Sequence, residues 1–419
     1  GINSILAKET VMYIERHIKK AFKSVEKFYN AILLTGSRQV GKSTFLKHTY
    51  NKLDYISFDN WNSLRDIKKN PQEFLLKAKK QLVLDEIQRI QDAFIAIKYI
   101  IDEYKEKEKV LYLLTGSQKF VLMKNISESL AGRLAILEMH GLSSREIYED
   151  DRTDIFSPKK EYIEKVTPKF KYSKNELWNR ILKGSYPEIY EKNRKDLQTF
   201  YSNIVETYVE RDVHEFLNIK DTFTFKKFLV SIAARSGQLL NMSEIGKEIG
   251  VDTKTVKSWV SVLEASNVIY LLYPFSLNVS KRMVKTPKVY LLDTGLLCYL
   301  TDWKEFKTLE KGAYSGSIFE TFVISEIIKS FANNGVRPDM YYFRNSNKEE
   351  IDLLFYENNT LYPIEIKKSA SPNINSIKSF RFIKSYYKNV NIGEGGIICT
   401  SSELKRIDDT NYIIPVEYI

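Results

Sequence analysis

The sequence has few of the residues that build disulfide or zinc frameworks. It holds two cysteines, Cys298 and Cys399, and four histidines in 419 residues. Neither a zinc ribbon nor a disulfide network fits that supply, so we expect a chain that works in a reducing cytoplasm. No apolar run approaches the roughly 18 residues that cross a bilayer, and we expect no membrane partner. The opening GINSILAKET lacks a basic stretch followed by an apolar core, which predicts no signal peptide.

Positive charge is in excess. Lysine and arginine number 64 against 53 acids, a net charge of +11. Such an excess favours a polyanionic partner such as DNA, and a generally lysine-rich proteome is the alternative. Hydrophobic residues make up 43% and charged residues 28%, which is typical of folded globular protein. The length indicates two to four domains.

The stretch NAILLTGSRQVGKSTFLKH near the front places an apolar strand before a glycine-rich loop and a helix. The loop matches G-x-x-x-x-G-K-[ST], the pattern in which backbone N–H groups surround phosphates at a helix N-terminus. Lys42 is expected to reach the β- and γ-phosphates and Ser43 to ligate Mg²⁺. A chance glycine-rich turn is the alternative. The predicted nucleotide-binding residues of the loop are Gly36, Ser37, Arg38, Gln39, Val40, Gly41, Lys42, Ser43 and Thr44.

Three later features complete the predicted nucleotide site. KQLVLDEIQ is a buried strand ending in Asp85, expected to hold Mg²⁺ through water, and Glu86, expected to polarise the attacking water; two helix-starting acids are the alternative. In KVLYLLTGSQ we expect Ser117 to sense the γ-phosphate, with Thr115 as the close alternative. Arg133 is a candidate arginine finger, which would need a neighbouring subunit or a folded-back element to place it, or equally a surface arginine.

This ordered set resembles the AAA+ superfamily. More narrowly, it resembles bacterial and archaeal AAA+-type ATPases that carry a C-terminal domain of unknown function with a nuclease-like core. GSYPEIY (184–190), VETYVERDV (205–213), KTPKVYLLDTGLL (285–297) and GSIFETFVISEI (316–327) continue the resemblance. It implies a multidomain α/β chain with an ATP- and Mg²⁺-dependent parallel-sheet ATPase domain at residues 1–149.

A polar stretch after residue 150 predicts a domain boundary there. Helical spacing follows, and we assign 150–235 to a helical linker or lid. Residues 236–284 carry helix-turn-helix spacing with a following wing. Joining domains or binding protein is the alternative role for such a module. The candidate DNA-contacting residues are Lys254, Thr255 and Lys257 on the second helix and Lys281, Arg282 and Lys285 in the wing, where Lys288 extends the same basic run.

Residues 285–419 predict a mixed α/β domain with acids inside apolar strands. Because strand side chains alternate between faces, Glu365 and Lys367 share a face in LYPIEIKK, opposite two isoleucines. An adjacent strand bearing Asp352 would add a second carboxylate to one cluster. Two carboxylates suit a divalent metal, and a lysine beside them suits metal-assisted phosphodiester cleavage.

This D-x(12)-E-x-K arrangement resembles the PD-(D/E)xK fold of restriction-endonuclease-like enzymes. The resemblance implies a metal at Asp352 and Glu365, catalytic help from Lys367, and Glu320 as an auxiliary acid; no proline precedes Asp352. We therefore expect an ATPase that engages DNA, and an ATP-regulated nuclease in defence or mobile-DNA processing is one form of it. The alternatives are a non-cleaving nucleotide switch and a signalling ATPase whose rear domains bind protein.

Overall fold

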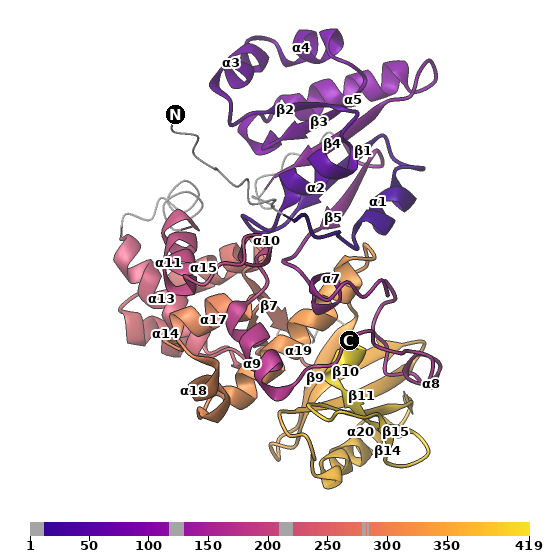
Figure 1. The fold of residues 1–419 in the computed structure, drawn as a ribbon, viewed down its shortest axis with the longest axis vertical. Coiled ribbons are helices and arrows are strands. Elements are labelled where there is room, and N and C mark those ends of the chain that lie inside the picture. Colours follow the sequence, from indigo (N-terminus) through magenta and orange to yellow (C-terminus); the bar gives the residue numbers. More distant parts are fainter. Residues whose placement is uncertain (1–11, 117–129, 209–220, 279–281, 283–284) are drawn as a thin grey trace, which may run out of the picture.

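The computed structural model describes residues 12–116, 130–208, 221–278, 282 and 285–419. A sheet domain at the front of the chain lies at one end of the molecule, and a second sheet domain, formed by the C-terminal residues, lies at the other (Figure 1). The helices of the middle part lie between and beside them. Among the described helices, none has the length and apolar character that crossing a membrane requires.

The front domain is a five-stranded parallel sheet in the order β2-β3-β4-β1-β5. Its strands are β1 (Ala31–Thr35), β2 (Asp54–Ser57), β3 (Gln81–Asp85), β4 (Leu111–Thr115) and β5 (Leu134–Glu138). Its helices are α1 (Lys19–Val25), α2 (Lys42–Thr49), α3 (Trp61–Lys69), α4 (Pro71–Lys77) and α5 (Ala93–Tyr104). Side chains of β1 alternate between two cores, Leu33 facing the core under α3 to α5 and Leu34 facing the core that contains α1 and α2. Burial on both faces explains the unbroken apolar strands.

Short helices lead from the front domain into the middle part. They are α7 (Ser144–Ile147), α8 (Lys160–Ile163), α9 (Lys174–Lys183), α10 (Pro187–Glu191) and α11 (Leu197–Tyr208). A compact unit then comprises α13 (Thr222–Ala234), β6 (Gln238–Leu239), α14 (Met242–Ile249), α15 (Thr253–Ala265), β7 (Ile269–Leu272) and β8 (Lys288–Leu291). Rings of α13 pack on α15, with Phe225 and Phe228 each 5.2 Å from Trp259 between centroids.

The strand at 288–291 corrects one predicted boundary. The predicted C-terminal domain, residues 285–419, includes the apolar stretch KVYLLD at 288–293. In the structure this strand is β8, which pairs antiparallel with both β6 and β7 in a three-stranded sheet. The middle unit therefore begins with α13 and extends through residue 291. Apolar character alone predicts a strand but not the sheet that it joins.

The C-terminal part starts with α17 (Thr294–Leu300), α18 (Phe306–Lys311) and the long helix α19 (Ser315–Ala332). A mixed sheet follows in the order β14-β15-β13-β11-β10-β9. Its elements are β9 (Met340–Arg344), β10 (Glu350–Glu357), β11 (Thr360–Lys367), the 3₁₀ segment 374–379, α20 (Phe380–Tyr386), β12 (Asn391–Ile392), β13 (Gly395–Cys399), β14 (Lys405–Arg406) and β15 (Asn411–Pro415). Strands β9, β10 and β11 are antiparallel, whereas β13 and β15 continue parallel to β11. Helix α19 is buried along most of its length because it packs between this sheet and the middle part.

Candidate functional site

The loop after β1 is shaped by two glycines. Gly36 has φ +146°, and an added Cβ would lie 2.1 Å from the carbonyl oxygen of Met139. Gly41 has φ +93° and stands directly before α2, where the loop enters the helix. Both positions exclude a side chain, one by contact and both by backbone conformation. The loop therefore keeps its backbone close to β5 and turns it toward the α2 N-terminus, as phosphate binding requires.

Lys42, the first residue of α2, is buried along this loop. Its ammonium donates to the carbonyl oxygens of Gly36 at 2.9 Å and Ser37 at 2.7 Å. These contacts hold the positive charge inside the curve of the loop. The position suits the predicted contact with phosphate oxygens.

Asp85, at the end of β3, gathers hydroxyl groups from three other elements. It accepts hydrogen bonds from Ser43 of α2 at 2.9 Å, from Tyr55 of β2 at 2.5 Å and from Thr115 of β4. The strand order explains this cluster, because β4 lies between β1 and β3 and their carboxyl ends meet at one edge. A carboxylate beside a serine hydroxyl is a hard oxygen donor set, so Asp85 and Ser43 fit a magnesium ion.

Thr115, the predicted alternative to Ser117, lies at the end of β4 beside Asp85. Its hydroxyl also accepts the backbone N–H of Glu86 at 3.3 Å. Ser117 lies outside the described residues. Thr115 therefore joins the ends of β3 and β4 at the center of the site.

Glu86 follows Asp85 in a left-handed conformation, with φ 58°. The side-chain amide of Gln88 donates to its carboxylate. Burial raises the pKa of Glu86, while Lys42 and the hydrogen bond from Gln88 oppose that rise. A carboxyl group with a raised pKa beside the phosphate loop suits general-base chemistry. Gln88 contacts this carboxylate and is not among the residues predicted for the site, although it stands in the quoted KQLVLDEIQ.

Arg133 does not reach this site. It stands before β5 at the amino edge of the sheet, where its carbonyl oxygen accepts the N–H of Ala31. Its guanidinium makes a bidentate pair with Asp102, at 2.6 and 3.0 Å. Because the phosphate loop follows the opposite, carboxyl end of β1, Arg133 does not contact the nucleotide site of its own chain. A finger that acts on the site of a neighbouring subunit stays a prediction.

Arg16 is a buried contact that the sequence analysis missed. Its guanidinium donates to the carbonyl oxygens of Val40, in the phosphate loop, at 2.8 Å and of His140 at 2.7 Å. It also pairs with Glu146 at 3.1 Å, with both side chains buried. The nearby sequence LSSREI (142–147) carries a capping box formed by Ser143 and Glu146. Arg16 ties the phosphate loop to the segment that leaves the front domain.

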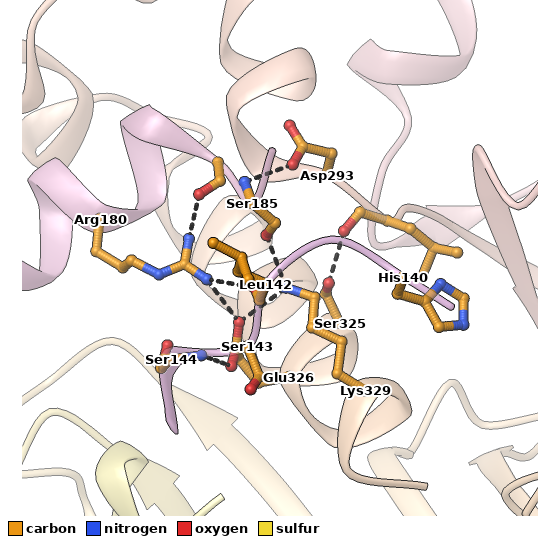
Figure 2. A network of polar contacts seen from close by, with 12 residues as sticks. His140, Leu142, Ser143, Ser144, Arg180, Ser185, Asp293, Ser325, Glu326 and Lys329 are labelled. Atoms are coloured by element: carbon orange, nitrogen blue, oxygen red, sulfur yellow. Dashed lines mark hydrogen bonds and ion pairs between the residues drawn. The ribbon is translucent and has the colours of Figure 1, made fainter. Parts of the chain in front are cut away.

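That segment enters a buried polar cluster (Figure 2). We call this cluster the joint; it is formed by Ser144, Arg180, Ser185, Glu326 and Lys329. Glu326 of α19 accepts the N–H of Ser144 at 2.7 Å and pairs with Arg180 of α9 at 3.0 Å and with Lys329 at 2.9 Å. Lys329 donates onward to the hydroxyl of Ser185 at 2.7 Å. Burial alone would raise the pKa of Glu326, yet Lys329 and Arg180 lower it below the usual range. The joint therefore connects the front domain, the middle helices and α19 through one shared carboxylate.

The phosphate loop also contacts the middle part directly. A Cβ added at Gly41 would lie 3.6 Å from Cγ of Pro187, in the GSYPEIY stretch. Ser37 and Gln39 line a small cavity together with Tyr186 and Leu296 of the middle and C-terminal parts. The nucleotide loop therefore faces the middle helices.

The C-terminal sheet brings together Asp352, Glu365 and Lys367. The Lys367 ammonium donates to Asp352 at 3.0 Å and to Glu365 at 2.7 Å, and the N–H of Ile366 donates to Asp352 at 2.8 Å. Burial and the neighbouring Asp352 raise the pKa of Glu365 to about 8. Antiparallel pairing of β10 and β11 explains the cluster. The single positive charge of Lys367 lies between the two carboxyl groups, whose oxygen atoms are the candidate metal donors of the cluster.

Glu320 makes its hydrogen bonds with residues outside the cluster of Asp352, Glu365 and Lys367. It accepts hydrogen bonds from Tyr290 at 2.6 Å and Lys288 at 3.3 Å, and burial raises its pKa to about 7. Lys288 also pairs with Glu350 at 2.6 Å. Within the described part of the chain, no three Asp, Glu, His or Cys side chains converge as metal ligands. The residues thus fit a metal only in part, and the predicted three-acid site with Glu320 is not formed.

The candidate DNA-contacting residues divide into two groups. Lys254, Lys257 and Lys285 are exposed, whereas the Thr255 hydroxyl donates to Asp252, the cap of α15, at 3.0 Å. Arg282 packs over the Tyr341 ring at 4.7 Å and donates to its hydroxyl at 2.7 Å, so it is not a free wing residue.

Two further lysines of the basic run 281–288, Lys281 and Lys288, are not observed as exposed DNA-contacting residues. Lys281 lies outside the described residues. Lys288, in β8, is 3% exposed and ion-paired to acids, so its side chain is not available for contact with DNA.

The site and sheet define the class of the front domain: a P-loop ATPase domain of the AAA type. Residues 29–148 match a family model described as an AAA domain. Residues 174–307 and 315–419 match two models described as domains of unknown function, DUF8612 and DUF4143.

Relatives match over most of the chain. An uncharacterized protein of Mycobacterium tuberculosis, Rv2008c, is 25% identical over 389 residues, covering 93% of this chain and 80% of its own length. An uncharacterized protein of Haemophilus influenzae is 20% identical, covering 85% and 87%. Among solved structures, the Walker-type ATPase PABY2304 of Pyrococcus abyssi is 15% identical, with a TM-score of 0.45, over 69% of this chain and 96% of that one. A Thermotoga maritima RuvB variant is 16% identical with a TM-score of 0.30, over 64% and 92%.

Proposed function

We propose that this chain is a magnesium-dependent ATPase whose nucleotide state controls how its middle and C-terminal parts dock on the front domain, and that these rear parts bind DNA. The observation that carries the proposal is the convergence of Lys42, Ser43, Asp85 and Glu86 at one sheet edge. A bound nucleotide would meet a loop that Arg16 connects to the joint. Differential contacts in two nucleotide states are what a switch requires.

Each residue of the site has a defined role in this proposal. Lys42 would hold the β- and γ-phosphate oxygens, and Ser43 and Asp85 would hold a magnesium ion, which when bound would supply positive charge to those oxygens. Glu86 accepts a proton from the attacking water, in line with the γ-phosphate, and Gln88 keeps its carboxylate oriented. The N-terminus of α2 adds its positive dipole.

Titration calorimetry with magnesium tests nucleotide binding. The wild-type chain is expected to bind ATP, and Lys42→Ala to bind it about 10- to 150-fold more weakly, because a charged hydrogen bond to phosphate contributes about 1.5–3 kcal/mol. Lys68→Ala, an exposed lysine of α3, is the matched control and should bind as the wild type does. Wild-type protein without measurable ATP affinity would overturn the proposal.

The DNA-binding part of the proposal rests on two modules. The order α13, β6, α14, α15, β7, β8 is typical of a winged helix, and exposed Lys254 and Lys257 lie near the start of its second helix-turn-helix element. The order α19, β9, β10, β11, α20, β13 is consistent with a restriction-endonuclease-like core bearing Asp352 and Glu365. A rear part that binds only protein is the alternative.

Nuclease activity is a second candidate function, favoured by the contact of Lys367 with both Asp352 and Glu365. A nuclease would nick supercoiled plasmid when Mg²⁺ or Mn²⁺ is supplied. Asp352→Ala and Lys367→Ala should each lower nicking at least about a hundredfold, the usual effect of removing a group that stabilises transition-state charge. Asp409→Ala, a fully exposed acid of the same domain, is the control. Intact plasmid, retained by the protein, would leave the non-cleaving switch.

A further inference from the structure

A 28-residue stretch of the C-terminal domain carries cations and no acids. Residues 366–393 contain no Asp or Glu. Their cations are Lys367, Lys368, Lys378, Arg381, Lys384 and Lys388. Residues 265–292 form a second stretch of the same length without Asp or Glu, and its cations are Lys281, Arg282, Lys285 and Lys288. The stretch 366–393 spans the end of β11, the 3₁₀ segment 374–379 and α20.

The structure exposes most of these charges on one element. Helix α20 packs inward through Phe380 and Ile383. Its other sides and the preceding segment display Lys378, Arg381, Lys384 and Lys388, all exposed. None of these four forms an ion pair within the described part of the chain.

Some exposed lysines of the front-domain helices have a nearby acid as their partner. Lys77, for example, is held by Glu73 at 2.6 Å, one turn away on the same helix. The four cations of the α20 region have no such neighbour, so their charge is directed to solvent and to whatever binds there.

Aromatic rings lie among these cations. Phe382 is 39% exposed and Tyr386 is 50% exposed, and they stand one helical turn apart. The Tyr386 ring is held edge-on against Phe343, at 5.5 Å between centroids. Exposed rings beside unpaired cations match a surface on which unpaired bases stack while phosphates meet lysine and arginine. In a duplex the base faces are already stacked, so rings of this kind favour a single strand.

The surface adjoins the acidic cluster of the same domain. The Ser379 hydroxyl, between Lys378 and α20, donates to Glu365 at 3.1 Å. A strand lying on α20 would therefore run beside Asp352, Glu365 and Lys367.

We propose that the basic aromatic surface, formed by Lys378, Arg381, Phe382, Lys384, Tyr386 and Lys388, binds single-stranded nucleic acid. The inference deepens the proposed DNA binding by naming a second contact region and the form of the ligand. It requires neither ATP hydrolysis nor cleavage.

Fluorescence anisotropy with the full chain tests it, using a labelled oligo-dT of about 20 nucleotides and a duplex of the same length, in EDTA to prevent cleavage. Phe382→Ala/Tyr386→Ala is expected to weaken oligo-dT binding about 5- to 100-fold, the usual effect of losing a stacked base, with an unchanged salt slope. Lys378→Ala/Arg381→Ala is expected to reduce the slope of log affinity against log salt by about 1.4, since each single-strand phosphate contact contributes about 0.7. Thermal unfolding checks that these exposed substitutions leave the fold intact.

Lys254→Ala/Lys257→Ala, on α15, is the matched control and should keep oligo-dT binding while weakening duplex binding. Oligo-dT binding that is unchanged in both α20 variants would overturn this inference and leave the α15 proposal standing. A wild-type chain that binds neither oligonucleotide at low salt would overturn both. Binding of anionic lipid vesicles without oligo-dT binding would assign the surface to a different polyanion and also overturn the inference.

Discussion

Glu86→Gln is expected to bind ATP with near wild-type affinity and to hydrolyse it about 10²- to 10⁴-fold more slowly. Glutamine has the shape of glutamate but accepts no proton. The charge of Lys42 and the donors around Asp85 stay in place, so binding is retained. Steady-state phosphate release and ATP calorimetry on the same preparation separate the two effects.

Two further variants are compared with Glu86→Gln in the same hydrolysis assay. Glu73→Gln, an exposed acid of α4, is the matched control and should hydrolyse ATP at the wild-type rate. Gln88→Ala should slow hydrolysis less than Glu86→Gln does, because Gln88 orients the base without accepting the proton. If Glu86→Gln hydrolyses ATP at the wild-type rate, another group is the base.

Arg180→Ala is expected to destabilise the folded chain by about 3–5 kcal/mol, the usual cost of leaving a buried charge without its partner. Arg180 and Glu326 are both nearly inaccessible to water, and Arg180 also donates to the carbonyl oxygens of Gly184 and Leu142. Urea unfolding of the wild type and the variant measures the difference. Glu326→Ala should cost a similar amount, and the double variant less than the sum, because both single changes break the same pair.

An exposed ion pair provides the contrast. Lys77→Ala removes a partner of Glu73 on the surface of α4 and should cost less than about 1 kcal/mol, because water screens that pair. The pKa of Glu326 is lowered in the folded chain, so its contribution is present above the ordinary glutamate pKa and is lost as the pH falls through the lowered value. The Arg180→Ala effect should therefore persist at neutral pH. A loss as small as that of Lys77→Ala would show that the joint does not hold the parts together.

Local patterns determined much of the front domain. The unbroken apolar runs at 31–34 and 82–84 became central parallel strands, because a strand covered by helices on both faces needs apolar side chains throughout. The glycines at positions 36 and 41 predicted the loop, because the loop backbone adopts φ angles there that other residues avoid. In the C-terminal sheet, alternation along a strand was enough to place Glu365 and Lys367 on one face, which their hydrogen bond bears out.

Only the tertiary structure decided which charged side chains meet across the chain. Arg133 and Arg282 have the residue type that a finger or a wing requires. Arg133, however, precedes β5 and lies at the amino end of the parallel sheet, where it pairs with Asp102. Arg282 packs against the ring of Tyr341. Arg16 reaches the phosphate loop, and Arg180 reaches Glu326 across 146 positions of sequence. The sequence by itself determined the elements, because periodicity and backbone freedom are local. The pairing of buried charges depends on how those elements pack, because a partner is chosen by distance in space.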